Sequence, residues 1–279
     1  MISFKKVAVL GPGLLGGSIA LAVKKHLPEL EIALWGRREE VAEQARALGI
    51  AGATSDLQVA LEGSDLVILA TPVGVMPSLV KQMDLDKPLL VTDVGSVKRI
   101  VHHELASLFE GKQAYFIGSH PMAGSEKTGL SAAKVDLLDG AACVLTNEDE
   151  VPNDLVAELA AFWKALCMTT RELSAEDHDY AVARVSHFPH VLASVGAKVG
   201  LAFEDIAHLA GGGMRDTTRV AAGDPDLWTE ILLENADALQ RSLGESITEL
   251  ANVQEMLRTS DADALKDFLA VAKCKRELI

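Results

Sequence analysis

Three glycines near the N-terminus are spaced as in a turn that binds a dinucleotide. Gly11, Gly13 and Gly16 form the pattern G-x-G-x-x-G between an apolar run and a helical stretch. The first glycine permits a tight turn, the second lets a pyrophosphate approach the backbone, and the third lets the helix pack closely on the strand. The amides at the helix start, around Leu14 and Leu15, then face the phosphates. We therefore predict dinucleotide binding, the alternative being a purely structural glycine turn.

The end of the second expected strand bears on which dinucleotide is bound. About 20 residues past the last glycine, an acidic residue would accept hydrogen bonds from the ribose 2′-hydroxyl of NAD. This chain has Gly36, Arg37 and Arg38 there, and a guanidinium is a planar fork that matches a 2′-phosphate. We therefore predict NADP. In the alternative the cofactor is NAD, the arginines are solvated, and Glu39 or Glu40 binds the ribose.

Four further stretches gather residues that can transfer protons or bind anions. They are Asp93–Lys98, Gly118–Glu126, Ser186–His190 and Gly211–Arg219. The first two follow expected strands, and open α/β sheets bind their ligands at the carboxyl ends of strands. In the third, Pro189 should kink a helix, and His187 and His190 share a face because they lie three residues apart. In the fourth, Arg215 and Arg219 share a face if the segment is helical.

Each stretch also has an explanation without function. His120 could be a core histidine with satisfied hydrogen bonds, and His187 and His190 could pack at the kink. The two arginines could pair with Asp216 or Asp224. Metal binding is not expected, because the chain has no HExxH motif and no Cys/His ligand spacing.

The elements that would position these residues alternate between strands and helices. Short aliphatic runs are expected as strands at Val7–Leu10, Ile32–Trp35, Leu66–Ala70, Leu89–Asp93, Tyr115–Ile117, Cys143–Leu145 and Met168–Arg171. Helical stretches such as Leu14–Lys25, Arg38–Leu48 and Pro152–Leu166 separate them. Continuous apolar strands joined by helices are typical of a parallel sheet covered on both faces. The sequence therefore predicts an α/β fold whose N-terminal domain, residues 1–172, is a doubly wound Rossmann-type domain.

Residues 173–279 predict an all-helical C-terminal domain that binds substrate and dimerises. Helices are expected over Ala175–Val199, Ile206–Ala210 and Leu227 to about Arg258. In the last of these, apolar residues recur at spacings of three, four or seven, and the stripe is too long for a small domain to cover by itself. We predict that part of it faces a second subunit in a homodimer; the alternative is an intramolecular core.

Composition and charge argue against several classes of protein. The 279 residues are 49% hydrophobic and 24% charged, which is an ordinary globular composition. The net charge of −14 argues against nucleic acid or an anionic membrane as partner, since both attract clustered basic charge. Glycines and a proline interrupt the uncharged run Val7–Val23, which argues against a signal peptide or a membrane helix. Three scattered cysteines suit a reducing cytoplasm, where we expect the protein.

Six motifs follow one another along the chain: GPGLLGGS, ATPV, DVGSVK, GSHPMAGSE, DHDYAVARVSHFPH and GGGMRDTTR. Together they resemble the motifs of the prephenate/arogenate (cyclohexadienyl) dehydrogenase family of tyrosine biosynthesis. The resemblance spans nearly the whole chain, and GSHPMAGSE and SHFPH followed by GGGMRDTTR are its specific motifs. It implies a Rossmann domain, a dimerising helical domain, and Thr71, Pro72 and Val73 beside the cofactor. One departure is at Arg37 and its neighbours, where NAD-using members carry an acidic residue.

The resemblance also implies a reaction and the residues that perform it. The reaction is the oxidative decarboxylation of prephenate (or arogenate) to 4-hydroxyphenylpyruvate (or tyrosine), with hydride transfer to NAD(P)+. His120 is similar to the catalytic histidine that bonds the ring hydroxyl, Ser96 to the serine bonded to both, and Arg219 to the arginine that binds the side-chain carboxylate. The other substrate-binding residues that the resemblance implies are His190, Glu126, Ser186 and Arg215.

Two other functions fit parts of the pattern. Another NAD(P)-dependent dehydrogenase of Rossmann-plus-helical build, acting on a hydroxy acid or an imino acid, would depend on a lysine in the helical domain, for which Lys198 is the candidate. A non-enzymatic dinucleotide-binding module would need the glycine turn but would have no use for His120, His190 and Arg219 together. Release of CO₂ separates the proposed reaction from a simple hydroxy-acid oxidation.

Overall fold

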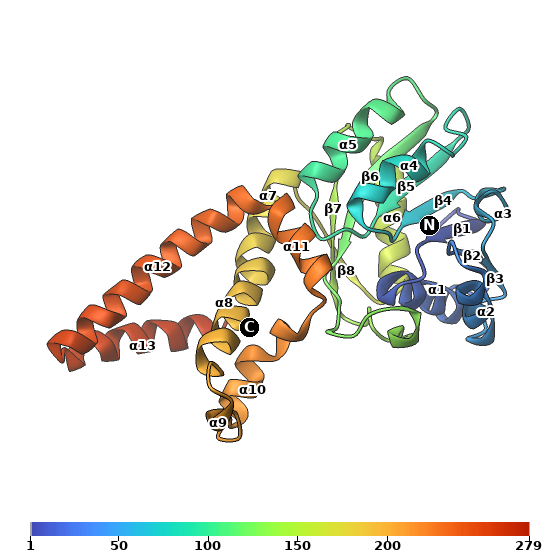
Figure 1. The fold of residues 1–279 in the computed structure, drawn as a ribbon. Coiled ribbons are helices and arrows are strands. Elements are labelled where there is room, and N and C mark those ends of the chain that lie inside the picture. The colour runs from blue at the N-terminus through green and yellow to red at the C-terminus, as the bar shows by residue number, and fades with distance from the viewer. Residues whose placement is uncertain (1, 279) are drawn as a thin grey trace.

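An eight-stranded sheet forms the N-terminal part of the protein in the computed structural model, which describes residues 2–278 apart from the side chain of Glu204 (Figure 1). The strands are β1 (Lys6–Leu10), β2 (Glu31–Trp35), β3 (Gly52–Thr54), β4 (Leu66–Leu69), β5 (Leu89–Asp93), β6 (Ala114–Pro121), β7 (Ala142–Thr146) and β8 (Thr169–Glu172), in the order β3-β2-β1-β4-β5-β6-β7-β8. All seven expected strands are present. Strand β3 was not predicted, because its three residues, one of them a glycine, show too little hydrophobic pattern.

The sheet is mixed, whereas the sequence predicts a parallel one. Strands β1 to β6 are parallel, but β7 runs antiparallel to β6, and β8 is parallel to β7. A parallel return usually requires a helical crossover. The connection from β6 to β7 contains only the short 3₁₀ helix η2 (Leu130–Ala132). The chain therefore returns in the opposite direction, and His120 lies inside β6 and not beyond its end.

Helices cover both faces of the sheet, which confirms the doubly wound prediction. On one face pack α1 (Leu14–His26), α2 (Glu39–Ala47) and α6 (Asn153–Ala165), with buried residues such as Ile19 and Phe162. On the other pack α3 (Leu57–Leu61), α4 (Met76–Val80) and α5 (Arg99–Phe109), with buried residues such as Leu105. A short 3₁₀ helix, η1 (Val73–Val75), precedes α4.

The C-terminal part is helical, as predicted. Its elements are α7 (Ala175–Val182), the π-helical segment η3 (Ala183–His187), α8 (Phe188–Gly200), α9 (Glu204–Ala207), α10 (Gly212–Thr218), the 3₁₀ helix η4 (Arg219–Ala222), α11 (Pro225–Glu234), α12 (Ala236–Thr259) and α13 (Ala262–Arg276). The expected helix interruption near Pro189 is the η3 segment, after which Pro189 occupies the first turn of α8. Helices α12 and α13 form a hairpin that projects away from the sheet (Figure 1).

The long helix expected from Leu227 is divided at Asn235. Asn235 has a non-helical backbone (φ −118°, ψ 30°), and its fully buried side chain donates to the backbone oxygen of Asp179 (2.7 Å) and contacts Nδ1 of His187 (3.3 Å). Hydrogen bonds to a distant helix thus compensate for the broken helical ladder, and periodicity alone does not reveal this break.

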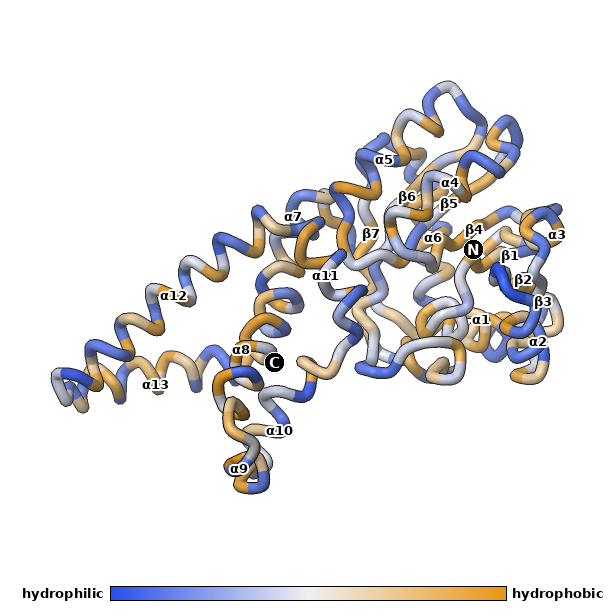
Figure 2. Tube along the Cα trace, viewed as in Figure 1, coloured by the Kyte–Doolittle hydropathy of each residue, from blue (hydrophilic) through white to orange (hydrophobic). Residues whose placement is uncertain are grey.

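Hydrophobic residues recur along α12 and α13 (Figure 2). Ile247, Leu250 and Leu257 are 63–68% exposed, so the described residues leave part of the apolar stripe uncovered. Among the described residues, none of the helices has the length and hydrophobicity that crossing a membrane requires.

Candidate active site

The glycine turn after β1 has the backbone geometry of a phosphate-binding loop. Gly11 has a φ of +123°, and a Cβ there would lie 2.3 Å from the oxygen of Ala70. A Cβ on Gly16 would lie 1.9 Å from the oxygen of Gly11, so α1 approaches the turn as closely as predicted. By contrast, nothing among the described residues lies within 4 Å of a Cβ built on Gly13. The backbone of Gly13 is therefore open to a ligand.

Two further observations fit a dinucleotide at this turn. No side chain in the described part of the protein caps the N-terminus of α1, so the amides of Leu14 and Leu15 can bind an anion. The segment Thr71–Val73 follows Ala70 beside the turn, and the buried Thr71 Oγ1 has no hydrogen-bond partner in the described part of the chain. The residues present thus fit the pyrophosphate of a dinucleotide.

The residues after β2 bear on the choice between NADP and NAD. Gly36 is buried against Pro12, and Arg37 and Arg38 are exposed without an ion pair to any described residue. Glu39, which would bind the ribose in the NAD alternative, is already bonded at 2.5 Å to the side chains of both Arg46 and Ser55. This arrangement leaves the two arginines available for a phosphate.

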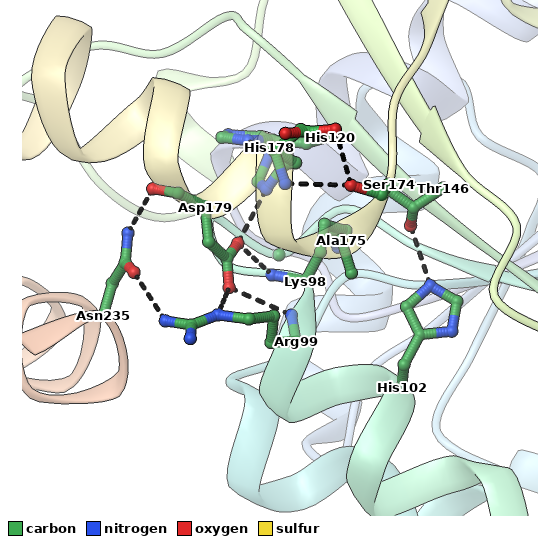
Figure 3. A network of polar contacts seen from close by, with 12 residues as sticks. Lys98, Arg99, His102, His120, Thr146, Ser174, Ala175, His178, Asp179 and Asn235 are labelled. Atoms are coloured by element: carbon green, nitrogen blue, oxygen red, sulfur yellow. Dashed lines mark hydrogen bonds and ion pairs between the residues drawn. The ribbon is translucent and has the colours of Figure 1, made fainter. Parts of the chain in front are cut away.

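His120 begins a buried chain of hydrogen bonds that joins the two halves of the protein (Figure 3). Its Nδ1 lies 2.8 Å from Nε2 of His178 on α7, whose Nδ1 lies 2.7 Å from Oδ1 of Asp179. His120 is 7% exposed, and the other two residues are at most 1% exposed. Burial, together with the neighbouring His178 and Lys98, holds the pKa of His120 well below its ordinary value. The imidazole is therefore neutral at pH 7 and can accept a proton.

Asp179 is held by hydrogen bonds from the start of α5. The backbone amide of Lys98 donates to Oδ1 (2.7 Å), and the backbone amide of Arg99 donates to Oδ2 (3.0 Å). Nε of Arg99 also donates to Oδ2 (3.2 Å). Burial by itself would raise the pKa of Asp179, but the hydrogen bonds from His178, Arg99 and Lys98 lower it overall. Arg99 also binds Asp237 on α12 through both terminal nitrogens. These contacts fix α7 and α12 against the start of α5.

A fully buried ion pair lies beneath His120. Asp93 at the end of β5 binds the ammonium of Lys98, and it also accepts from the amides of Gly95 (2.7 Å) and Ser119 (3.2 Å). Ser96 is half-buried in the same turn. The structure gives no hydrogen bond between Ser96 and His120 among the described residues, although the turn that holds Ser96 follows β5 and His120 lies in the neighbouring strand β6.

Histidines of the helical domain gather around Trp228. The ring of His190 stacks on Trp228 with centroids 3.5 Å apart and an angle of 11°, and His187 meets the same ring edge-on at 6.3 Å. Both histidines thus point to one side, as their spacing predicts, and burial lowers the pKa of His187 to about 4. Ser186 lies half-buried beside them in η3.

A cavity of about 400 Å³ opens next to His190 and Trp228, between α8 and α11. Lys198, the lysine on which the rival dehydrogenase interpretation depends, lines this cavity. None of the described lining residues belongs to the sheet domain, so this cavity is separate from strand β6, which carries His120.

Arg219 connects the helical domain to the loop that follows His120. Its guanidinium lies 3.6 Å from the carboxylate of Glu126, and both side chains are exposed. The alternative partner Asp224 instead caps α11. Arg215 is exposed on α10 and makes no ion pair with the described residues. The structure therefore brings Arg219 and Glu126 together and leaves Arg215 on the surface.

Three residues of this site were not predicted from the sequence: His178, Asp179 and Trp228. The first two stand in the motif DHDYAVARVSHFPH, and a His-Asp pair on the same helical segment as His187 was the available signal. Trp228 was assigned only to the apolar stripe. Its stacking on His190 depends on a contact between α8 and α11 that helical spacing does not show.

A Rossmann domain followed by a helical domain is the architecture of one class of dehydrogenases. Its members bind a nicotinamide dinucleotide on the first domain and complete the substrate site with the second. The protein is of that class. Residues 19–169 match the family description "Prephenate dehydrogenase, nucleotide-binding domain", and residues 174–271 match "Prephenate dehydrogenase, dimerization domain". The chain belongs to the prephenate dehydrogenase family.

Individual relatives agree with this assignment. The chain is 38% identical to prephenate dehydrogenase of Lactococcus lactis, over 98% of this chain and 77% of the relative. It is 35% identical to cyclohexadienyl dehydrogenase of Zymomonas mobilis, over 95% of this chain and 92% of the relative. The crystal structure of Aquifex aeolicus prephenate dehydrogenase with hydroxyphenyl propionate and NAD+ superposes with a TM-score of 0.87 at 27% identity, covering 99% and 98% of the two chains.

Proposed function

We propose that the protein catalyses the oxidative decarboxylation of prephenate or arogenate in tyrosine biosynthesis, with NADP as the hydride acceptor. The observation that carries the proposal is the ion pair between Arg219 and Glu126. It joins a guanidinium of the helical domain to the loop that follows β6, the strand that carries the buried His120. A ring acid between them would have its hydroxyl near the imidazole and its side-chain carboxylate near the guanidinium.

In this proposal the bound NADP supplies one thing, a carbon that accepts hydride from the substrate ring. The neutral His120 accepts the proton of the ring hydroxyl as the hydride leaves, and Ser96 helps to orient that hydroxyl. Arg219 exchanges Glu126 for the substrate carboxylate and binds it through two parallel hydrogen bonds. His190 and Ser186 contact the ring from α8 and η3. Because aromatisation drives the loss of CO₂, the protein mainly positions the reactants.

A two-by-two steady-state assay tests the proposal: prephenate and arogenate, each with NADP and NAD, with reduced nucleotide and CO₂ measured together. We expect equal amounts of both products with at least one substrate. Reduced nucleotide without CO₂ would support the hydroxy-acid or imino-acid dehydrogenase. Nucleotide binding without turnover would support the non-enzymatic module.

Replacing Arg219 with Ala should raise KM by about 10- to 100-fold and change kcat little. The carboxylate contact exists in both ground and transition states, so its loss is a loss of uniform binding, and a charged hydrogen bond contributes about 1.5–3 kcal/mol. Steady-state kinetics check this, with Arg258→Ala as control because Arg258 is also an exposed arginine paired with a glutamate. An unchanged KM together with a large fall in kcat would contradict the role of Arg219 in binding the substrate carboxylate.

Replacing Arg37 with Ala should weaken NADP binding about tenfold or more and leave NAD binding nearly unchanged. Arg37 would bind the 2′-phosphate, which NAD lacks, and a charge-assisted pair contributes about 1.5–3 kcal/mol. Nucleotide titrations of the free enzyme measure both affinities, with Arg46→Ala as a control because Arg46 is held by Glu39. Equal losses for both nucleotides would indicate general damage, and a wild type that prefers NAD would overturn the NADP assignment.

We further propose a homodimer formed through the C-terminal helices, in the cytoplasm. The exposed apolar residues of α12 and α13, among them Leu250 and Leu257, support the interface, and the three cysteines are free, as suits a reducing compartment. For the two domains we propose the ranges 1–172 and 173–279, because β8 ends at Glu172 and α7 begins at Ala175.

A further inference from the structure

We propose that His178 and Asp179 form a proton relay behind His120, which sets the tautomer of His120 and receives the positive charge that forms during turnover. The inference deepens the proposed function and rests on it for the identity of the proton donor. His178 and Asp179 are positioning residues here, because only His120 would touch the substrate.

The direction of every hydrogen bond in the relay follows from Asp179. A carboxylate can only accept, and its other neighbours, the amides of Lys98 and Arg99 and Nε of Arg99, are all donors. The hydrogen on His178 must therefore be on Nδ1, 2.7 Å from Asp179 Oδ1. This leaves a lone pair on Nε2 of His178, which accepts from Nδ1 of His120 at 2.8 Å. The unprotonated nitrogen of His120 is then Nε2, the one free to serve as base.

The relay is rigid because both of its ends are anchored. His178 is fully buried, and its ring also packs edge-on against that of His120 with centroids 5.0 Å apart. Asp179 is bonded to the first residues of α5, and its backbone oxygen accepts from Asn235. A side chain held in this way keeps one tautomer and one ring orientation, as outer partners of reactive histidines commonly do.

The proton moves in two linked transfers. The hydroxyl O–H bond of the substrate breaks and an N–H bond forms at Nε2 of His120, while the Nδ1–H bond of His120 breaks and an N–H bond forms at Nε2 of His178. The carbon loses its hydride to the nucleotide, and the oxygen becomes a carbonyl. When the ring carboxylate leaves as CO₂, its bonding electrons make the ring aromatic and turn that oxygen into a phenolate. The two transfers then reverse, and the phenolate takes back the proton.

Electrostatics explain why the charge would not stay on His120. That ring is buried, and Lys98 and His187 are among its neighbours, so a cation there lacks a partner. The charge of Lys98 itself is balanced by Asp93. On His178 the same charge would lie directly against the carboxylate of Asp179. Moving the proton one ring further therefore turns an unpaired buried cation into an ion pair.

Three substitutions separate the two roles of the relay. In His178→Gln the new amide oxygen lies near the position of Nε2 of the histidine. This oxygen can accept a hydrogen bond from His120 but cannot take its proton. His178→Phe keeps an aromatic ring but has no hydrogen-bond acceptor for Nδ1 of His120. In Asp179→Asn an amide nitrogen can donate to Nδ1 of His178, which would reverse the tautomers of both His178 and His120. The same replacement in a Ser-His-Asp triad stabilises the wrong tautomer of the catalytic histidine. The matched control is His102→Gln, since His102 is also a buried histidine, bonded to Thr146 and outside the proposed site.

We expect single-turnover hydride-transfer rates to fall about tenfold in His178→Gln and about 100-fold or more in His178→Phe and Asp179→Asn, within the usual range for general acid–base catalysis. His102→Gln should stay near the wild type. In mixtures of H₂O and D₂O, two protons moving together give a curved dependence of rate on deuterium content, and His178→Gln should make it linear. Equal rates in His178→Gln and His178→Phe would overturn the tautomer role, and a wild-type rate in His178→Gln would overturn the proton transfer.

A second readout needs no turnover. Nitrogen NMR of ¹⁵N-histidine-labelled free enzyme reports which ring nitrogen carries hydrogen. We expect His120 protonated at Nδ1 in the wild type and in His178→Gln, and at Nε2 in Asp179→Asn. The opposite tautomer in the wild type contradicts the relay whatever the substrate proves to be. If neither cyclohexadienyl substrate reacts but the expected tautomers are seen, the proposed function fails and the relay geometry stands.

Discussion

Replacing His120 with Asn is expected to lower kcat by roughly 10²–10⁴-fold, the usual contribution of a positioned general base. The asparagine amide can still donate to His178, so the buried acceptor keeps a partner and the fold should survive. What the variant lacks is the second ring nitrogen, which would face the ring hydroxyl. The loss should therefore appear in kcat, with KM and nucleotide affinity changed little.

Steady-state kinetics and a circular dichroism spectrum of the same sample check this expectation, and a loss below threefold would remove His120 from the chemistry. The pH profile provides a second check. Burial holds the pKa of His120 well below its ordinary 6.5, so the base is neutral at pH 7, and kcat/KM should decline only as the solution becomes acidic enough to protonate it. An acid limb at or above pH 7 would contradict this assignment.

Replacing Lys98 with Met is expected to lower the free energy of unfolding by about 3–5 kcal/mol. Lys98 and Asp93 are both fully buried, and methionine fills much of the space of the lysine chain without its charge. The carboxylate of Asp93 keeps its bonds to the amides of Gly95 and Ser119, but it loses its only cation among the described residues. An uncompensated buried charge is more costly than the loss of the pair itself.

Urea unfolding measures this loss, and two further variants interpret it. Lys87→Met removes the exposed partner of Asp84 and should leave the urea midpoint unchanged, since both side chains are solvated. The double variant Asp93→Asn/Lys98→Met should recover part of the lost stability, because no unpaired charge remains in the core. If Lys98→Met and Lys87→Met gave the same midpoint, the buried pair would not stabilise the fold.

Much of the fold could be predicted from the sequence because the relevant signals are local. Continuous aliphatic runs mark strands that are buried on both faces, and the glycine spacing before α1 marks a turn whose backbone no larger residue could adopt. The strand β3 and the break at Asn235 were missed. One is too short to show a pattern, and the other is stabilised by Asp179 and His187 from a different part of the chain.

By itself, therefore, the sequence determined which residue types stand at the ends of which strands, and with them the nucleotide turn and the candidate base His120. Only the tertiary structure decided what those residues touch: that β7 runs against β6, that Glu126 meets Arg219, and that His178 and Asp179 stand behind His120. The reason is physical. Periodicity and propensity act over a few residues, whereas a buried hydrogen bond or ion pair depends on which distant segments the packed core brings together.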